Sequence, residues 1–438
     1  MSKKNVAPGT LDPTFGNQGA VRLPFPGFPE FDVRSVLELP DKKLLVATVG
    51  WIQEPARIWR LNEDGTLDTQ FGDGGALDIA LKNAEMYFIS AFSALSNGGW
   101  LIAGSYLATD NVTGLALVRF RADGQLDESF GEQGVRFLPY DEMGQPDKAG
   151  SQKRRRMMAR NPVGSGHNVA QQVDGKIVFV TSVYMEEIDT FKGIVLRFNP
   201  DGSNDNTFND HGFAIIDIED DATFGVYGLG VATQPDGKVV ACGRFITSSP
   251  FIQRGFIVRF DEAGRLDGEF NKGAPVIVAH ENSVILEAVT IRKNDGAIIA
   301  VGSAARVGVM LGAIVVLNSS GSFNLVFNNG KPLISNFAPA GGHWRFCDAK
   351  PDGSILVAGY SSIRLINSSD AFMTARYLAN GSLDPLFNGQ GYAVFDDELP
   401  LFLRHVALLK DDRIAACGEI RTPDSMSIVG GWIVRYQV

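Results

Sequence analysis

The residues with the most obvious capacity for chemistry lie in a short acidic segment, DGQLDESFGEQG, which runs from Asp123 to Gly134. It places two aspartates and two glutamates among glycines, and related segments begin at Asp64 and Asn380. Carboxylates gathered in a turn could bind Ca²⁺, which takes about six to eight oxygen ligands. The spacing lacks the pattern of an EF-hand loop, so the other copies decide between a metal site and a structural turn.

Seven copies of this motif are present, each centred on a phenylalanine that follows Gly-x-Leu-Asp-x-x or a variant of it. The seven phenylalanines are Phe15, Phe71, Phe130, Phe208, Phe270, Phe327 and Phe387. Successive copies are 56 to 62 residues apart, except for one interval of 78. An arginine precedes the motif aspartate by eight positions, and the one copy that has Val316 instead also has Asn324 in place of the aspartate. This joint loss predicts a salt bridge between the two positions.

The predicted arginine–aspartate pairs lie within the repeats, and one of them joins the two ends of the chain. They are Arg60–Asp68, Arg119–Asp127, Arg197–Asp205, Arg259–Asp267, Arg376–Asp384 and Arg435–Asp12. A carboxylate held by an arginine is a poor calcium ligand. We therefore interpret the motif as a structural turn, whose glycines permit a positive φ, and we expect neither a metal nor a cofactor.

Short apolar runs between the motifs predict the elements that carry them. One run pair, TQPDGKVVACG, is typical of a β-hairpin with a tight turn. Two further runs, such as FIVRF and GFAIIDI, complete four strands per unit. Seven such units with little helical signal predict an all-β fold, a seven-bladed β-propeller with four antiparallel strands per blade. The expected blades of this single domain, 1–438, are 33–82, 86–140, 166–218, 227–279, 286–336, 344–396, and 403–438 plus 19–25.

The two ends of the sequence are complementary parts of one unit. The chain ends with three strands of a repeat, and it begins with a motif and a fourth strand. Placing Pro8 after Val438 restores the eight-residue spacing between Arg435 and Asp12. We therefore predict that the N-terminal strand completes the last blade and closes the ring, which removes a free sheet edge.

The hairpin turn Pro-Asp-Gly-Lys together with Gly-x-Leu-Asp-x-x-Phe-Gly-x-x-Gly resembles the delta-60 repeat family of bacterial proteins. The resemblance extends over nearly the whole chain and departs at Asp205, where the leucine is missing, and at Asn324. The family is defined by its repeat and implies no settled activity, so no catalytic residue is carried over.

The first strand of each propeller blade lines the central channel, and one position near the variable loops carries unusual residues. This position holds Arg34, His167, Arg345 and Arg404 in four blades and Ser90, Leu229 and Ala288 in the others, with Trp344 beside Arg345. One interpretation is an anion or sugar-acid pocket at the channel mouth. The other is a set of solvated arginines that pair with acids such as Glu38 or Asp348.

Loops between the second and third strands of three consecutive blades are unusually apolar. They contain Phe251, Ile252, Met310, Leu311, Ile363 and Leu365. Exposed together, these side chains would form a patch that contacts a partner or a membrane. Alternatively, the loops fold inward and cover the ends of the blades.

Other features limit the functions that remain. The insertion 141–165 is basic, but the net charge of −10 argues against nucleic acid as a partner, and a mobile loop or lid is the plainer interpretation. The apolar segment 297–317 is long enough for a membrane span, yet the repeat predicts two strands there. No Sec signal peptide is evident, so we expect a cytoplasmic protein by default, with non-classical secretion as the alternative.

The sequence favours a non-enzymatic binding scaffold that recognises a protein or glycan partner through the variable loops and the channel mouth. Common nucleotide-binding, hydrolase and metalloprotease motifs are missing. A carbohydrate-active hydrolase or lyase remains an alternative, because acids from different blades can meet in space. A secreted or membrane-active effector that uses the apolar loops is a further alternative.

Overall fold

The computed structural model describes most of the chain. The described residues are 7–25, 32–49, 55–82, 84–109, 112–140, 142–143, 168–185, 188–218, 223–248, 250–280, 283–306, 309–337, 341–362, 370–397, 399–422 and 427–438. The predicted insertion 141–165 lies outside these residues, apart from 142 and 143.

Seven four-stranded antiparallel sheets make up the structure. The first comprises β2 (Asp32–Glu38), β3 (Leu44–Val49), β4 (Ala56–Leu61) and β5 (Ala76–Ile79). The second comprises β6 (Ala84–Ala94), β7 (Trp100–Ala108), β8 (Thr113–Phe120) and β9 (Val135–Pro139). The third comprises β10 (Val169–Gln171), β11 (Ile177–Met185), β12 (Thr190–Phe198) and β13 (Phe213–Ile216). The fourth comprises β14 (Thr223–Thr233), β15 (Val239–Thr247), β16 (Gln253–Phe260) and β17 (Val276–Val278).

The remaining sheets follow the same pattern. The fifth comprises β18 (Val284–Ile291), β19 (Ile298–Arg306), β20 (Val309–Leu317) and β21 (Leu333–Ser335). The sixth comprises β22 (His343–Ala349), β23 (Ile355–Ser362), β24 (Asp370–Tyr377) and β25 (Tyr392–Phe395). The seventh comprises β26 (Leu401–Leu408), β27 (Ile414–Arg421), β28 (Ile428–Tyr436) and β1 (Ala20–Leu23). Two single-turn 3₁₀ helices, η1 (Asn271–Gly273) and η2 (Asn328–Gly330), occupy motif turns.

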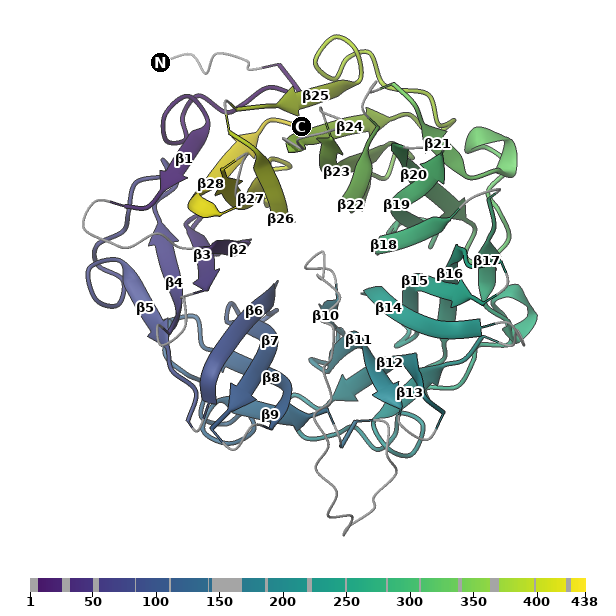
Figure 1. Cartoon of the computed structure of the whole chain (residues 1–438), viewed down its shortest axis with the longest axis horizontal. Helices are drawn as coiled ribbons and strands as arrows, with labels where there is room; N and C mark the ends of the chain where they lie inside the picture. Colours follow the sequence, from purple (N-terminus) through teal and green to yellow (C-terminus); the bar gives the residue numbers. More distant parts are fainter. Residues whose placement is uncertain are drawn as a thin grey trace.

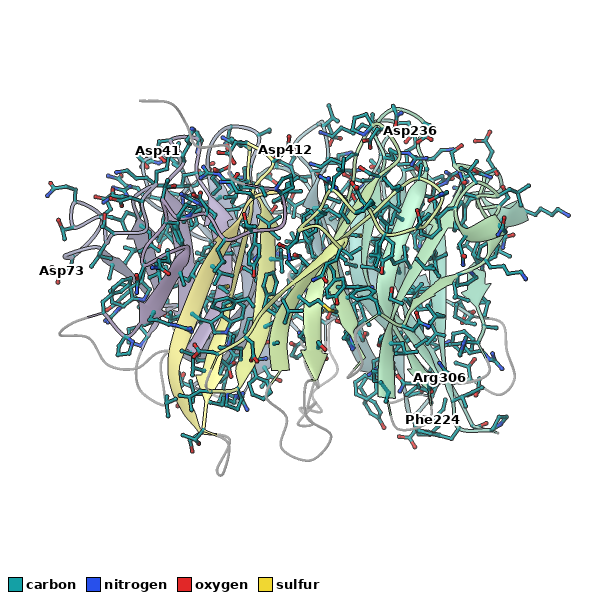
Figure 2. The ribbon with its side chains drawn as sticks, turned by 90° about the horizontal axis from the view of Figure 1, so that it is seen from above. Asp41, Asp73, Phe224, Asp236, Arg306 and Asp412 are labelled. Atoms are coloured by element: carbon teal, nitrogen blue, oxygen red, sulfur yellow. The ribbon has the colours of Figure 1, made fainter. Side chains whose placement is uncertain are left out.

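The sheets are arranged as the blades of a ring, with the first strand of each blade toward the centre (Figure 1). The predicted seven-bladed β-propeller is therefore confirmed. In the side view, the hairpin turns at Asp41, Asp236 and Asp412 lie on one face, and Phe224 and Arg306 lie on the other (Figure 2). We call the first the turn face and the second the loop face.

The apolar core is divided among the seven interfaces between neighbouring blades. Each of seven clusters of buried side chains draws residues from two adjacent blades, as the cluster with Val46 and Trp59 of blade one and Ile433 of blade seven illustrates. Middle strands are covered on both sides, and all six residues of β3 are buried. This explains why the sequence shows continuous apolar runs at these strands rather than alternation.

The apolar segment 297–317 forms the hairpin of β19 and β20, as the repeat predicted. Among the described residues, no helix is long and apolar enough to cross a membrane.

The N-terminal strand β1 is the outer strand of the seventh sheet, where it pairs antiparallel with β28. The segment before β1 is held as well, because Gly9 donates its amide to the Gln437 carbonyl at 2.8 Å and Gln437 donates to Thr10 at 2.9 Å. Residues from the two ends of the sequence are therefore hydrogen-bonded to each other.

The acidic motif forms the turn between the third and fourth strands. Nε of each of the six motif arginines lies 2.6–2.9 Å from Oδ2 of its aspartate. Each guanidinium also covers the motif phenylalanine ring, 4.5–5.5 Å from its centroid. The other carboxylate oxygen caps the turn; Asp205 Oδ1, for example, accepts from the Thr207 amide at 3.1 Å.

The electrostatics of the turn agree with a structural role. Burial alone would raise the pKa of Asp205, but hydrogen bonds from Thr207 and Lys176 and the charge of Arg197 lower it to about 2. In the described part of the chain, no group of three or more His, Cys, Asp or Glu side chains is arranged to hold a metal ion.

Candidate functional site

A β-bulge in the inner strands carries the channel residues singled out in the sequence. The register with the second strand slips by one residue at Arg34, Ser90, Leu229, Arg345 and Arg404. A bulge leaves one residue unpaired and re-aims its side chain. We call these positions the bulge residues.

Blade five corrects the predicted alignment. Its bulge residue is Glu287, between Leu286 and Ala288 in the register, and not Ala288 itself. The hairpin turn of this blade has one extra residue, since Gly296 donates to Arg292 four positions back while the equivalent Gly237 donates to Gln234 three positions back. Counting back from the turn therefore missed an acidic side chain at this position.

Arg34 and Arg404, from adjacent blades, meet at one buried carboxylate. Glu419 of β27 is fully buried and accepts from Nε of Arg404. Its other oxygen, Oε2, accepts from Nε of Arg421 at 2.7 Å, and Arg34 Nη1 lies 4.0 Å from Oε1, the oxygen bound by Arg404. Arg34 also pairs with Asp32 of its own strand. We call these five residues the arginine cluster.

The pKa values of the two acids of the arginine cluster are shifted in opposite directions. Burial, followed by the hydrogen bond with Glu419, raises the pKa of Asp32 to about 8, against the opposing charge of Arg34. Burial would also raise the pKa of Glu419, but the hydrogen bond with Asp32 and the charges of Arg404 and Arg34 lower it. With three guanidinium groups against two carboxyl groups, of which Asp32 is the one that holds a proton more readily, the cluster has an excess of positive charge.

This pairing predicts an unusual pH dependence of stability. Because the folded chain keeps a proton on Asp32 that the unfolded chain releases near pH 4, the free energy of unfolding should fall as pH rises from about 4 to 8, by up to about 1.4 kcal/mol per pH unit. Asp32→Asn should abolish this decline, because an amide mimics the protonated carboxyl group. Urea unfolding of both proteins between pH 5 and 9 measures the difference. If the free energy of unfolding changed equally with pH in both proteins, the raised pKa of Asp32 would be contradicted.

Arg345 of blade six belongs to a second cluster, which lies between blades five and six. Its Nε lies 3.1 Å from Oε2 of Glu287, whose Oε1 is 2.6 Å from Nε2 of His343. The His343 ring stacks on Tyr360 with centroids 4.9 Å apart. Burial alone would raise the pKa of Glu287, but the charges of His343 and Arg345 lower it to about 2.

The predicted channel residues are thus distributed between two clusters. Their acid partners are Glu419, Asp32 and Glu287 instead of the suggested Glu38 and Asp348, which contact Lys410 and Lys350. His167 lies outside the described residues.

Trp344 corrects a further expectation, because it is fully buried between blades five and six. A Cβ at Gly312 would stand 2.2 Å from its indole nitrogen, so the glycine makes room for the ring. Trp344 is therefore a core residue and does not face a ligand at the ring mouth.

The apolar loop residues are only partly exposed. Phe251 is 69% exposed and contacts the 58% exposed Phe224, with centroids 6.4 Å apart. Ile252 and Met310 are half-buried, and Leu311 is buried under its blade. Leu311 therefore cannot contribute to a surface patch. Ile363 and Leu365 lie outside the described residues.

A second variable position in each blade was missed by the sequence comparison. The sixth residue of the second strand is Arg244, Tyr360 or Glu419 in three blades and Val49, Ser105, Ser182 or Ser303 in the others. Tyr360 and Glu419 contact bulge residues directly, and the charge of Arg244 acts on Glu287. Comparing this position across the seven hairpins would have found them.

One family model matches parts of the chain. Four segments match the family model described as "Domain of unknown function (DUF5122) beta-propeller", at residues 39–71, 95–130, 234–270 and 350–387. These segments span hairpins and motifs of blades one, two, four and six. Blade five has lost its arginine–aspartate pair, and the motif of blade seven is divided between the chain ends.

Solved structures with similar architecture have low sequence identity. The polysaccharide lyase Uly1 is 8% identical, with 92% of this chain and 89% of that chain covered and a TM-score of 0.47. Sqt1 of Chaetomium thermophilum, bound to the N-terminus of ribosomal protein L10, is 12% identical with 94% and 98% covered and a TM-score of 0.47. YCF48 bound to D1 peptide is 11% identical with 99% and 100% covered and a TM-score of 0.45. No curated protein matches the chain in sequence. Similarities at this level carry no argument about function.

Proposed function

We propose that this propeller is a non-enzymatic binding scaffold for an acidic ligand, a carboxylate-bearing glycan or polypeptide, at the loop-face end of the ring centre. The observation that carries the proposal is the arginine cluster. Two bulge residues, Arg34 and Arg404, converge with Arg421 on one ionised carboxylate. Guanidinium groups in excess over carboxylates bind an incoming carboxylate through charge-assisted hydrogen bonds.

The geometry gives the cluster an accessible side. Glu419 is fully buried, whereas the side chains of Arg34 and Arg421 are 26% and 22% exposed. The local positive charge stands out against the net charge of −10, so an acidic ligand would be attracted to this region rather than to the whole surface.

Replacing the most exposed arginine tests the proposal. Arg34→Gln should weaken binding of polygalacturonate or poly-glutamate by about 10- to 100-fold, because a hydrogen bond to a charged group contributes about 1.5–3 kcal/mol. Isothermal titration at low salt measures the affinity, and the two polymers separate a glycan from a polypeptide ligand. Arg57→Gln, on the outer half of the same blade, removes the same charge and serves as control. Equal affinity of Arg34→Gln and the unchanged protein would refute the site.

A specific observation favours a carbohydrate-active hydrolase or lyase as the second candidate. Burial raises the pKa of Asp32, while the charges of Arg404 and Arg34 help to lower that of Glu419, and two carboxyl groups whose pKa values are pushed apart can act as an acid and a base. The titration mixtures with polygalacturonate should therefore be assayed for new chain ends. Cleavage that disappears in Asp32→Asn would favour the enzyme over the scaffold.

We also propose that the repeat is of the delta-60 type and that β1 closes the ring. The Leu-Asp-x-x-Phe turn and its arginine partner support the first proposal, and the β1–β28 pairing supports the second.

A further inference from the structure

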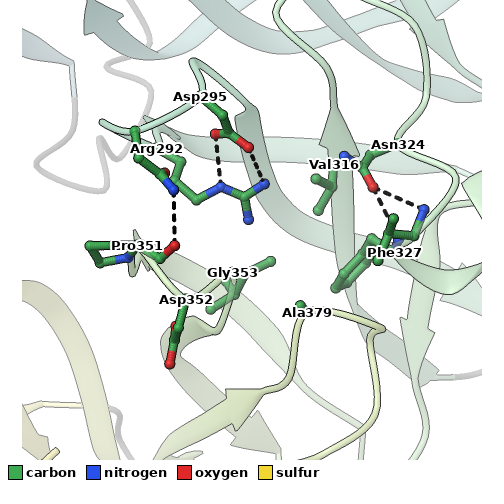
Figure 3. Close-up of a pocket in the computed structure, with 12 residues that line it drawn as sticks. Arg292, Asp295, Val316, Asn324, Phe327, Pro351, Asp352, Gly353 and Ala379 are labelled. Atoms are coloured by element: carbon green, nitrogen blue, oxygen red, sulfur yellow. Dashed lines mark hydrogen bonds and ion pairs between the residues drawn. The ribbon is translucent and has the colours of Figure 1, made fainter.

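Blade five has a pocket at the place where six other blades have a motif arginine. The pocket has a volume of about 270 Å³ and lies on the turn face between blades five and six (Figure 3). Val316, which replaces the arginine, and Asn324, which replaces the aspartate, both line it. A second cation is also missing, since Ala297 stands where Lys238 of blade four pairs with the aspartate.

Blade four shows what occupies this space in a complete repeat. Arg259 donates from Nε to Asp267 at 2.7 Å and from Nη1 to the Ser319 carbonyl of the next blade at 2.6 Å. Its guanidinium covers the Phe270 ring at 5.0 Å, and its Nη1 lies 3.4 Å from Gln234. Arg119 and Arg435 make the same contact with a carbonyl of the following blade.

Every counterpart of these partners lines the pocket of blade five. Asn324 corresponds to Asp267, Phe327 to Phe270, Ala379 to Ser319 and Arg292 to Gln234. The turn itself is intact, because Asn324 Oδ1 still accepts the Val326 amide at 3.0 Å. The ring and the backbone carbonyl that receive the guanidinium in blade four are therefore kept as Phe327 and Ala379. The two side-chain acceptors are not kept, because Arg292 is a cation and the Asn324 oxygen already accepts two backbone amides.

The charges around the pocket favour a cation. Arg292 is engaged by Asp295 through two hydrogen bonds of 2.9 and 2.7 Å, which neutralises both groups (Figure 3). Asp352 remains as a further negative charge, and hydrogen bonds from Ser354 lower its pKa. The pocket thus combines a net negative charge, an aromatic ring and the Ala379 carbonyl.

We propose that this pocket binds a guanidinium group supplied by a ligand, either an arginine side chain of a polypeptide or a free guanidino compound. The planar cation would lie over Phe327 and donate to the Ala379 carbonyl. Six sibling sites in the same molecule hold a guanidinium over the same motif phenylalanine, which makes guanidinium a better match than ammonium. The site is on the opposite face from the arginine cluster and does not depend on it.

The test uses the full-length protein and four probes: agmatine and tripeptides with arginine, citrulline or lysine at the centre. We expect the arginine tripeptide to bind at least 10-fold more tightly than the citrulline and lysine tripeptides, with calorimetry as the readout. Citrulline has nearly the same shape without the charge, and lysine keeps the charge without the planar group. Tighter binding of agmatine than of the arginine tripeptide would identify a free compound as the ligand class.

Two variants place the binding in this pocket. Val316→Arg should reduce arginine binding at least 10-fold, because it restores the chain's own guanidinium; Ser319→Arg adds the same charge outside the pocket and should leave binding unchanged. Asn324→Asp should increase the affinity for the arginine tripeptide several-fold, because it restores the missing carboxylate. This variant still tests the proposal if Val316→Arg does not fold. Equal binding of the arginine and citrulline tripeptides, or binding unaffected by both pocket variants, would overturn the proposal.

Discussion

A chain that lacks residues 1–25 is expected to be unfolded, or nearly so, at 25 °C. The deletion removes the fourth strand of blade seven and the buried side chains of Phe15 and Leu23. It also leaves Arg435, whose side chain is 2% exposed, without Asp12. A bare sheet edge, a cavity and an unpaired buried charge together should remove an amount comparable with a typical domain stability of about 5–15 kcal/mol. Circular dichroism and urea unfolding measure the loss.

A circular permutant supplies the matched control for this deletion. Residues 8–25 moved to follow Val438 should restore the stability, since Gly9 and Thr10 already contact Gln437. The same residues are then present in the same sheet, with only the chain connection altered. If the truncated chain unfolds at the same urea concentration as the full chain, β1 does not close the ring.

The second large effect is expected at a motif arginine of blade three. Arg197 and Asp205 are each only 3% exposed, and Arg197 also covers Phe208. Arg197→Ala should lower the free energy of unfolding by about 3–5 kcal/mol, because the buried carboxylate loses the closer of its two cationic partners and keeps only Lys176, at 3.2 Å. Guanidinium chloride unfolding at pH 7 measures the change.

Blade five suggests the control for the arginine variant. The combination Lys176→Ala, Arg197→Val and Asp205→Asn copies its residues into blade three and removes both signs of charge. It should be less destabilising than Arg197→Ala alone, because removing both partners leaves no buried charge. A triple variant that is less stable than Arg197→Ala would mean that the arginine acts mainly by packing on Phe208.

The strands and the motif turns could be predicted from the sequence because the same pattern recurs seven times. A short apolar run that is ambiguous in one copy is identified as a strand by its counterparts in the other copies. The hairpins and the N-terminal strand are found where the repeat placed them. The joint replacement of the motif arginine and aspartate by Val316 and Asn324 correctly indicated that these two positions interact. Each of these depends on local spacing, which a repeat displays directly.

The candidate site could be predicted only in part. Arg34 and Arg404 were found, but Glu419 was not. Arg34 reaches Glu419 from the next blade, and Arg404 reaches it from a bulge that sequence spacing does not reveal. Glu287 was missed for a related reason: one extra turn residue shifted the count. Trp344 was misplaced because a strand's two faces cannot be told apart where both are apolar.

The pairing of β1 with β28 also determines the order in which this molecule can be assembled. Among the described strands, the one that is synthesised first has its hydrogen-bonding partner in the one that is synthesised last. Blade seven therefore cannot be completed before β28 has left the ribosome, and Asp12 cannot meet Arg435 until then. This contact spans nearly the full length of the sequence, and contacts of this kind slow folding. Until β1 and β28 pair, the sheet edges that they form in blade seven are open to other chains.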